Sequence, residues 1–443
     1  MRQISLSNRF FLLFGIAIVI TAMGYVSHQI IWLSAISFYG IGLLLLCDLL
    51  FLFVVLKPVR YVKHYQEKLS LGDRNPIKLT LSNIGKTKVW FTVNEGYPLD
   101  MQERTKHYNA MLNPLESIEI TYEYTPKKRG VFRFTDTYIF TKSIFGLIER
   151  RTIISHPAPI HVYPSILQMK RYEQMLFQQN KIQSGIKRVR KIGMSREFEQ
   201  IRNYVPGDEI KSINWKATSR KNELMVNQYQ EEKSQNVYCI IDKGRIMQME
   251  SMGLSMLDYA INSTLVLSNI CLHKSDKIGL FTFSDKLGVT LSASNKRIQL
   301  KKILEVLYAQ KTTFQDSNFE LLQQHVNDKV RTRSLLLLFT NFENPFTLQR
   351  SLPYLLQLKK RNLLVVVLFK NEELEQFSTL SPNSQRQFYQ GILASKMLIE
   401  KEKMAKQLNA MGIQTILTKP EELSTAVINK YLTLKAKRLL SSV

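Results

Sequence analysis

The side chains best suited to catalysis are scattered along this sequence. No GxSxG motif supplies a serine nucleophile, and the adjacent carboxylates Glu231-Glu232 and Glu421-Glu422 are typical of exposed, solvated faces. No HExxH motif or other tight metal-ligand spacing joins the histidines, which are His28, His64, His107, His156, His161, His273 and His325. Too few roles of a catalytic site can be filled, so the sequence predicts a protein that is not an enzyme.

The most informative group of charged and aromatic side chains lies between Phe198 and Arg220. Pro206, Gly207 and Asp208 predict a turn, because proline fixes φ, glycine accepts positive φ and aspartate hydrogen-bonds the backbone. Trp215 adds an aromatic anchor, and four cations could pair with nearby carboxylates: Arg202, Lys211, Lys216 and Arg220 with Glu197, Glu199 and Asp208. On physical grounds alone, this segment is interpreted as a salt-bridged connector that packs between two domains.

The same segment resembles the hallmark of the domain of unknown function 58 family, which runs approximately R-x-Y-x-P-G-D-x-x-R-x-I-D-W-K-A-x-A-R. The matching positions are Arg202, Tyr204, Pro206, Gly207, Asp208, Ile213, Trp215, Lys216, Ala217 and Arg220. Lys211, Asn214 and Ser219 depart from the pattern. Similar flanks at Arg129-Gly130, Phe145-Gly146-Leu147 and Tyr163-Pro164 extend the resemblance over nearly the whole chain.

This resemblance implies several properties of the chain. Members of the family are membrane-anchored and carry a von Willebrand factor A-like domain. They are often linked with AAA+ ATPases related to MoxR, and such pairs are proposed to act in the assembly or activation of other proteins. The motif residues with side chains or turn roles suited to interaction are Arg202, Tyr204, Pro206, Gly207, Asp208, Trp215, Lys216 and Arg220.

Asp242 ends the apolar run Val237–Ile241, and ligands of open α/β sheets bind at such strand ends. The von Willebrand factor A-like domain that the resemblance implies commonly holds a metal ion on D-x-S-x-S, a threonine and a later aspartate. Here Gly244 and Ile246 replace the two serines, and Asn341 stands at the later aspartate position.

Lys243 and Arg245 add positive charge beside Asp242. One carboxylate beside two cations is a poor site for Mg²⁺, which prefers several oxygen ligands. The positions Asp242, Gly244 and Asn341 therefore predict a degenerate metal site and no cofactor. Asp242 is expected to pair with Lys243, with Arg245 or with a residue of a partner.

Residues 1–60 contain two apolar stretches, Phe10–Tyr25 and Ile30–Leu56, which predict a hairpin of two membrane-spanning helices. Asp48 lies in the second stretch, where an ionisable residue is a functional candidate. The plainer interpretation is that Asp48 faces the helix partner or a second copy, or is protonated. Basic residues flank the hairpin at Arg2, Arg9, Lys57, Arg60, Lys63 and Lys68, and the loop has none, so both termini are expected in the cytoplasm.

The remainder of the chain divides into three parts by pattern. Residues 68–165 alternate apolar and polar side chains in short segments, which predicts a small β-sandwich. Residues 166–235 form the connector that carries the family signature. Residues 236–443 alternate buried apolar strands with helices, which predicts a largely parallel, doubly wound α/β sheet.

The chain has a net charge of +25, which favours anionic partners. Membrane lipid is the nearest such partner for an anchored protein. The basic cluster Lys187–Lys191 could contact lipid, an acidic protein or nucleic acid. Cys47, Cys239 and Cys271 form no metal or disulfide pattern and fit a reducing cytoplasm.

The leading hypothesis is a membrane-anchored scaffold or adaptor whose α/β domain offers its strand-end face to another protein, with an AAA+ ATPase as the expected partner. A membrane-associated basic nucleic-acid-binding protein is one alternative, although the absence of a recognition motif argues against nucleic acid. A metal-dependent hydrolase that uses Asp242 is the other. The sequence does not specify the oligomeric state.

Overall fold

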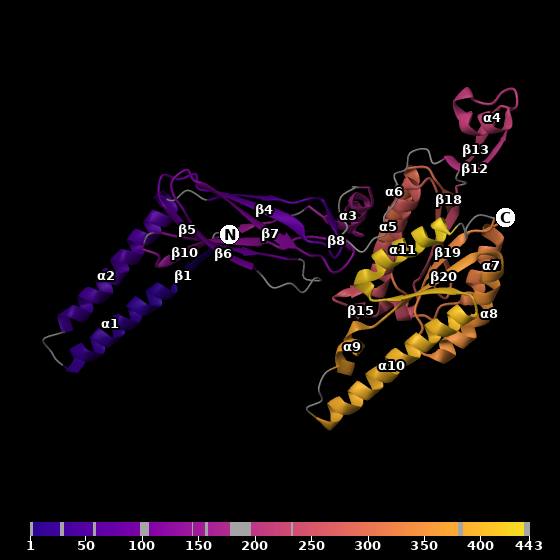
Figure 1. Ribbon diagram of the computed structural model, residues 1–443. Coiled ribbons are helices and arrows are strands. Elements are labelled where there is room, and N and C mark those ends of the chain that lie inside the picture. The colour runs from indigo at the N-terminus through magenta and orange to yellow at the C-terminus, as the bar shows by residue number, and fades with distance from the viewer. Residues whose placement is uncertain are drawn as a thin grey trace. The chain divides into compact units, whose positions relative to one another are not determined.

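The computed structural model describes residues 3–26, 31–55, 59–97, 106–143, 145–155, 158–177, 196–231, 234–379 and 384–437 (Figure 1). The basic cluster Lys187–Lys191 lies outside these residues. The chain divides into two compact units, Met1–Tyr163 and Pro164–Val443.

The first unit begins with strand β1 (Gln3–Leu6) and two apolar helices, α1 (Asn8–Val26) and α2 (Ile31–Leu50). A π-helical turn, Phe51–Val55, extends α2. The segments Asn8–Tyr25 and Trp32–Val54 are long and apolar enough to cross a membrane, and only 11% of each is buried. Two apolar N-terminal helices are therefore present, as predicted.

Asp48 of α2 has a different environment from the one expected. It is fully buried, and its Oδ2 accepts hydrogen bonds of 2.9 Å from the Leu147 and Ile148 backbone amides. The Ser143 hydroxyl donates to its Oδ1. The carboxylate therefore fixes the end of α2 to a loop of the β-rich part, because backbone N–H groups of that loop need a buried acceptor. The expectation that Asp48 faces a helix partner or a second copy was wrong.

Short sheets make up the rest of this unit. One sheet has the order β1-β10-β9-β5-β6, with β10 at Ile148–Ile154, β9 at Thr137–Lys142, β5 at Val89–Glu95 and β6 at Lys106–Leu112. A second has the order β2-β4-β7, at Arg60–His64, Asn75–Ser82 and Ser117–Tyr124. A third has the order β3-β11-β8, at Lys68–Ser70, Ile160–Tyr163 and Gly130–Phe132.

The first two of these sheets share a core. Leu81 of β4 packs in one apolar cluster with Phe91 and Val93 of β5 and Ile139 of β9. Alternate residues of β4 and β5 are buried, as the period of a half-buried strand requires. The alternation in residues 68–165 therefore correctly indicated a β-rich region.

The second unit contains a six-stranded sheet of order β18-β17-β14-β19-β20-β21. Only β18 is antiparallel to its neighbour within this sheet. The strands are β14 (Asn236–Asp242), β17 (Lys277–Phe283), β18 (Leu287–Ser294), β19 (Leu335–Phe339), β20 (Leu363–Phe369) and β21 (Gln414–Thr418). From β14 the chain adds β17 and β18 on one side, and from β19 it adds β20 and β21 on the other. The direction of strand addition therefore reverses between β14 and β19, and α/β proteins bind ligands at the carboxyl ends of strands at such a point.

Helices cover both faces of this sheet. On one face, α5 (Met256–His273), α6 (Ile298–Ala309) and α11 (Leu423–Ala436) bury apolar side chains against Val237, Cys239 and Ile241. On the other, α7 (Phe319–Lys329), α8 (Pro345–Arg361) and α10 (Gln385–Ala410) do so against Tyr238 and Ile240. The α/β sheet expected for residues 236–443 is thus present.

Helix α3 (Ile166–Phe177) was expected within the connector. It packs instead on the α5 side of the sheet, where Ile166, Met169 and Tyr172 contact the apolar core. The Asn269 amide donates a hydrogen bond of 2.9 Å to the Glu173 carboxylate and ties α3 to α5. Residues 166–177 therefore belong to the α/β unit.

Candidate functional site

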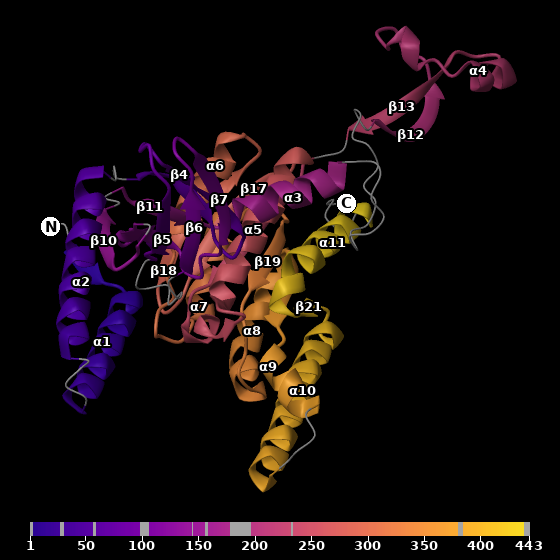
Figure 2. The same cartoon turned by 90° about the vertical axis from the view of Figure 1, so that its left-hand side faces the viewer.

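The segment with the family signature forms a β-hairpin, called here the signature hairpin (Arg196–Glu231). Its strands β12 (Arg196–Asn203) and β13 (Met225–Glu231) are antiparallel. Between them lie a 3-10 turn (Ile210–Ser212) and the short helix α4 (Trp215–Lys221), which forms the tip (Figure 2). The side chains of Glu197, Glu199 and Lys211, expected in ion pairs, lie outside the described part of the structure.

Arg202 and Asp208 shape the turn before the tip. The Arg202 guanidinium lies 2.6 Å from Asp208 Oδ1, and the Val205 amide donates 3.0 Å to Asp208 Oδ2. The Arg202 guanidinium and the Val205 amide hold the pKa of Asp208 below its ordinary value, because both stabilise the charged carboxylate. Gly207 adopts a φ of +110°, which requires glycine at this position of the turn.

Asn214 then starts helix α4. Its Oδ1 accepts a hydrogen bond of 3.0 Å from the Ala217 amide, and its Nδ2 donates 2.8 Å to Asn227 Oδ1 on β13. The family pattern has aspartate here, which can also cap a helix, so this departure keeps the capping function and loses a negative charge. Asn222 ends α4 in a left-handed conformation.

The tip leaves several motif side chains in solvent. Trp215 is 68% exposed and Ile210 is 73% exposed. Lys216 and Arg220 are also exposed, and no salt bridge involves either of them among the described residues. Within the signature, the structure therefore joins Arg202 to Asp208 and directs Trp215, Lys216 and Arg220 outwards.

The second group of candidate residues surrounds the end of β14 and is called here the Asp242 cup (Asp242, Gly244, Ser317, Thr340 and Asn341). Asp242 is buried, and its Oδ2 accepts a hydrogen bond of 2.6 Å from the Thr340 hydroxyl. Its Oδ1 accepts from the Ser317 hydroxyl and, at 2.8 Å, from the Gly244 amide. Burial raises the pKa of Asp242, and these three hydrogen bonds oppose that rise.

Gly244 and Asn341 have defined roles in the cup. A Cβ on Gly244 would overlap the Ser317 hydroxyl, so glycine leaves room for Ser317 to reach Asp242. Asn341 and Asp242 line one cavity of about 80 Å³. The Asn341 Oδ1 is buried and has no hydrogen-bond partner in the described residues. The cup therefore brings together Asp242, Gly244 and Asn341, the predicted positions.

The expected cation partners of Asp242 lie elsewhere. The Arg245 guanidinium lies 3.3 Å from Glu343 Oε1 and 3.8 Å from Asp316 Oδ1 at the mouth of the cup. Burial lowers the pKa of Lys243, and Asp285 opposes that change. The expectation that Asp242 pairs with Lys243 or Arg245 was wrong, because hydroxyl and amide donors already satisfy its carboxylate.

Ser317 and Thr340 are the cup residues that sequence reasoning missed. Thr340 directly follows β19, so its place at a parallel strand end was a usable signal. Ser317 lies in the loop before α7, far from Asp242 along the chain, and no local pattern indicates it.

The cup offers a poor donor set for a divalent cation. Asp242 is the one carboxylate of the cup and Gly244 supplies no side-chain oxygen, so the other side-chain oxygens are the neutral ones of Ser317, Thr340 and Asn341. In the part of the chain that the structure describes, no group of three or more His, Cys, Asp or Glu side chains could hold a metal.

Comparison with known proteins adds a family match. Residues 200–376 match the family described as protein of unknown function DUF58. The DUF58 match begins in the signature hairpin, includes the Asp242 cup and ends before α10.

Relatives and solved structures share only parts of the chain. An uncharacterized protein YeaD of Bacillus subtilis (strain 168) is 26% identical over 131 residues, which cover 29% of this chain and 31% of YeaD. The match to the conserved hypothetical protein BatB from Bacteroides thetaiotaomicron covers 46% of this chain and 100% of BatB. The identity is 13% and the TM-score is 0.32. A CARDB domain from Pyrococcus furiosus covers 24% of this chain and 94% of that domain at 12% identity, with a TM-score of 0.18.

Proposed function

We propose that this chain is a membrane-anchored scaffold or adaptor that acts by binding another protein. The observation that supports this proposal is that some residues of the signature hairpin shape its tip while others remain exposed on it. Arg202, Asp208 and Asn214 shape the tip, whereas Trp215 stays exposed. Exposed tryptophan and arginine side chains on a shaped loop are typical anchors of protein interfaces.

We further propose an AAA+ ATPase related to MoxR as the partner, in the assembly or activation of other proteins. This partner comes from the family resemblance, and the DUF58 match over residues 200–376 supports that resemblance. A von Willebrand factor A-like assignment for residues 236–443 is supported by the strand order, with its single antiparallel edge strand, and by a carboxylate at the end of β14.

In this proposal α1 and α2 anchor the chain in the cytoplasmic membrane with both termini in the cytoplasm. The length and apolar character of the two helices support the anchoring. Basic residues on both flanks, and none in the loop, support the orientation.

A crosslinking pull-down from native membranes, with and without ATP, tests the partner. The matched variants are Lys216→Glu/Arg220→Glu in the signature hairpin and Lys301→Glu/Lys302→Glu, which makes the same charge change on exposed positions of α6. We expect an AAA+ ATPase to be recovered with wild type and the α6 variant and lost with the hairpin variant. Recovery of lipid or nucleic acid alone would contradict the adaptor function.

The proposal excludes a metal-dependent hydrolase at Asp242. Calorimetric titration of the purified chain with Mg²⁺ or Mn²⁺ tests this exclusion, and the expected result is no binding in the micromolar range. Tight binding that disappears in Asp242→Ala, together with hydrolytic activity, would favour the hydrolase instead.

A further inference from the structure

Helix α10 (Gln385–Ala410) is only partly used by the core of the α/β unit. At 26 residues it is about 39 Å long. Three of its four buried residues, Met404, Ala405 and Leu408, lie in the second half, against the sheet, and the fourth, Ala394, lies in the first half. The first half lies beyond the sheet beside α9 (Glu372–Thr379), as both views show (Figure 1, Figure 2).

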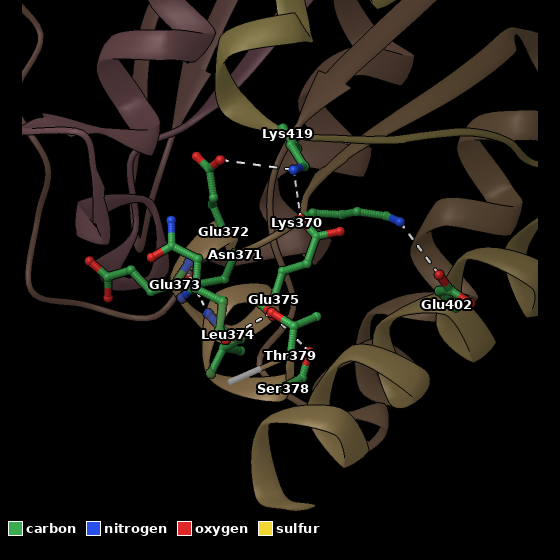
Figure 3. Close-up of polar contacts among 11 residues, drawn as sticks. Lys370, Asn371, Glu372, Glu373, Leu374, Glu375, Ser378, Thr379, Glu402 and Lys419 are labelled. Carbon is green, nitrogen blue, oxygen red and sulfur yellow. Dashed lines mark hydrogen bonds and ion pairs between the residues drawn. The ribbon is translucent and has the colours of Figure 1, made fainter. Parts of the chain in front are cut away.

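Ion pairs at the strand ends hold α9 and α10 in place. The Lys419 ammonium, just after β21, lies 2.7 Å from Glu375 and 3.8 Å from Glu372 of α9 (Figure 3). The Lys370 ammonium, just after β20, lies 3.4 Å from Glu402 of α10. These partly exposed pairs contribute little energy, but they connect α9 to the end of β21 and α10 to the end of β20.

The free half of α10 exposes large apolar side chains over a wide arc. Tyr389 is 62% exposed and Leu393 is 58% exposed. At 100° per residue, these two fall on the half of the helix opposite buried Ala394, together with exposed Phe388, Ile392 and, two residues past the midpoint, Ile399. Phe388, Ile392 and Ile399 also line a groove of about 570 Å³ beside α9. Soluble monomers rarely leave such a contiguous apolar surface uncovered.

The charges on this surface decide between possible occupants. This face carries three cations, Arg386, Lys396 and Lys403, and one carboxylate, Glu400, which lines the groove with Lys396 and Lys403. A second copy would bring the same cations together, which disfavours symmetric pairing through these residues. An anionic bilayer surface matches both properties, because interfacial helices bury apolar side chains at the acyl boundary and place Lys and Arg against phosphate groups.

We propose that the first half of α10 docks on the anionic surface of the membrane. Phe388, Tyr389, Ile392, Leu393 and Ile399 enter the interfacial region, and Arg386 and Lys396 contact lipid phosphates. This inference rests on the proposed membrane anchoring, since a tether raises the local concentration of lipid around a surface that binds weakly alone. The surface lies outside residues 200–376, the segment that matches DUF58.

The test uses the full chain reconstituted in lipid nanodiscs. Leu393→Cys carries an environment-sensitive fluorophore in a Cys47→Ser background, because Cys239 and Cys271 are buried. Discs of phosphatidylcholine alone are compared with discs that also contain phosphatidylglycerol. We expect the emission to shift to shorter wavelength, and to be quenched by lipid-borne quenchers, in the anionic discs. A label at Gln324→Cys, exposed on α7, is the matched control and should not respond.

Charge variants and the possible negative results distinguish docking on lipid from a failure of the membrane anchor and from self-association. Arg386→Glu/Lys396→Glu should abolish the lipid-dependent shift, and Lys301→Glu/Lys302→Glu should leave it unchanged. A chain that inserts into the discs while the probe stays in water overturns this inference and leaves the anchoring intact. A chain that fails to enter the discs overturns both. A shift that depends on protein concentration and not on lipid would assign the surface to a second copy.

Discussion

The Ser317 hydroxyl donates to the buried carboxylate of Asp242 through the space that a side chain at position 244 would fill. Thr340 donates to the other oxygen of the same carboxylate at 2.6 Å. Glycine at 244 and serine at 317 are therefore coupled, although 73 residues separate them along the chain. Ser317 and Thr340 thus each supply a hydrogen bond to one oxygen of this buried carboxylate.

Gly244→Ala should destabilise the α/β unit by about 1–3 kcal/mol, because the new Cβ displaces Ser317 from Asp242. The same change should cost less in a Ser317→Ala background, where the clashing hydroxyl is gone. Native-state hydrogen exchange of β14 amides in the full chain measures both costs. Equal costs in the two backgrounds would contradict the coupling.

Asp242→Asn should change how stability depends on pH. The folded pKa of Asp242 is raised above its ordinary 3.8 by burial, so the folded state binds the proton more tightly than the unfolded state. The stabilisation from this proton is complete below 3.8 and is lost as pH rises through the folded pKa. The free energy of unfolding of wild type, minus that of Asp242→Asn, should therefore fall as pH rises across that window. Hydrogen exchange of β14 amides measures both free energies. A difference that rises with pH would show that the three hydrogen bonds outweigh burial.

Arg202→Gln should destabilise the turn of the signature hairpin, because it removes the ion pair with Asp208. In wild type the Arg202 guanidinium, 2.6 Å away, holds the pKa of Asp208 below its ordinary 3.8. That pair stabilises the turn above 3.8 and loses its effect as pH falls through the folded pKa. A carboxyl NMR titration should show the Asp208 pKa moving up towards 3.8 in Arg202→Gln and staying in place in Lys216→Gln.

Lys63→Met should strongly destabilise the β-rich part of the first unit. The Lys63 ammonium lies 2.7 Å from Glu95 Oε2, and both side chains are buried. Removal of the cation leaves a buried carboxylate uncompensated, at a cost of about 3–5 kcal/mol.

The exposed pair Lys78–Glu119, 2.6 Å apart, supplies the control for Lys63→Met. Lys78→Met should cost no more than about 1 kcal/mol, because water already screens that pair. Lys63→Met/Glu95→Gln should recover part of the loss, since no charge remains buried. Hydrogen exchange of β4 and β5 in the full chain checks all three, and similar costs for Lys63→Met and Lys78→Met would refute the argument.

Some elements could be predicted because their signal is local. The strands Leu335–Phe339 and Leu363–Phe369 are uninterrupted apolar runs, which central parallel strands require. Strands β6 and β10 carry no such local signal, since their partly polar residues show no clean alternation.

In the candidate site, too, features with a local sequence signal could be predicted and long-range contacts could not. The turn at Pro206–Asp208 and the strand-end position of Asp242 are local features, and the sequence indicated both. The partners of Asp242 come from loops before α7 and after β19, and the partners of Asp48 come from the loop at Ser143–Ile148. Expectations for Asp242 and Asp48 failed because each carboxylate found hydroxyl and amide donors far away in sequence.

By itself, the sequence determined the two apolar helices, the β-rich region, the α/β sheet and the outline of the signature turn. These follow from hydrophobic periodicity and turn chemistry, which act over a few residues. Only the tertiary structure decided that Ser317 reaches Asp242, that Trp215 remains in solvent, and that half of α10 lies uncovered. Burial and hydrogen-bond partners depend on which distant segments meet, and that is settled only when the sheets and helices pack.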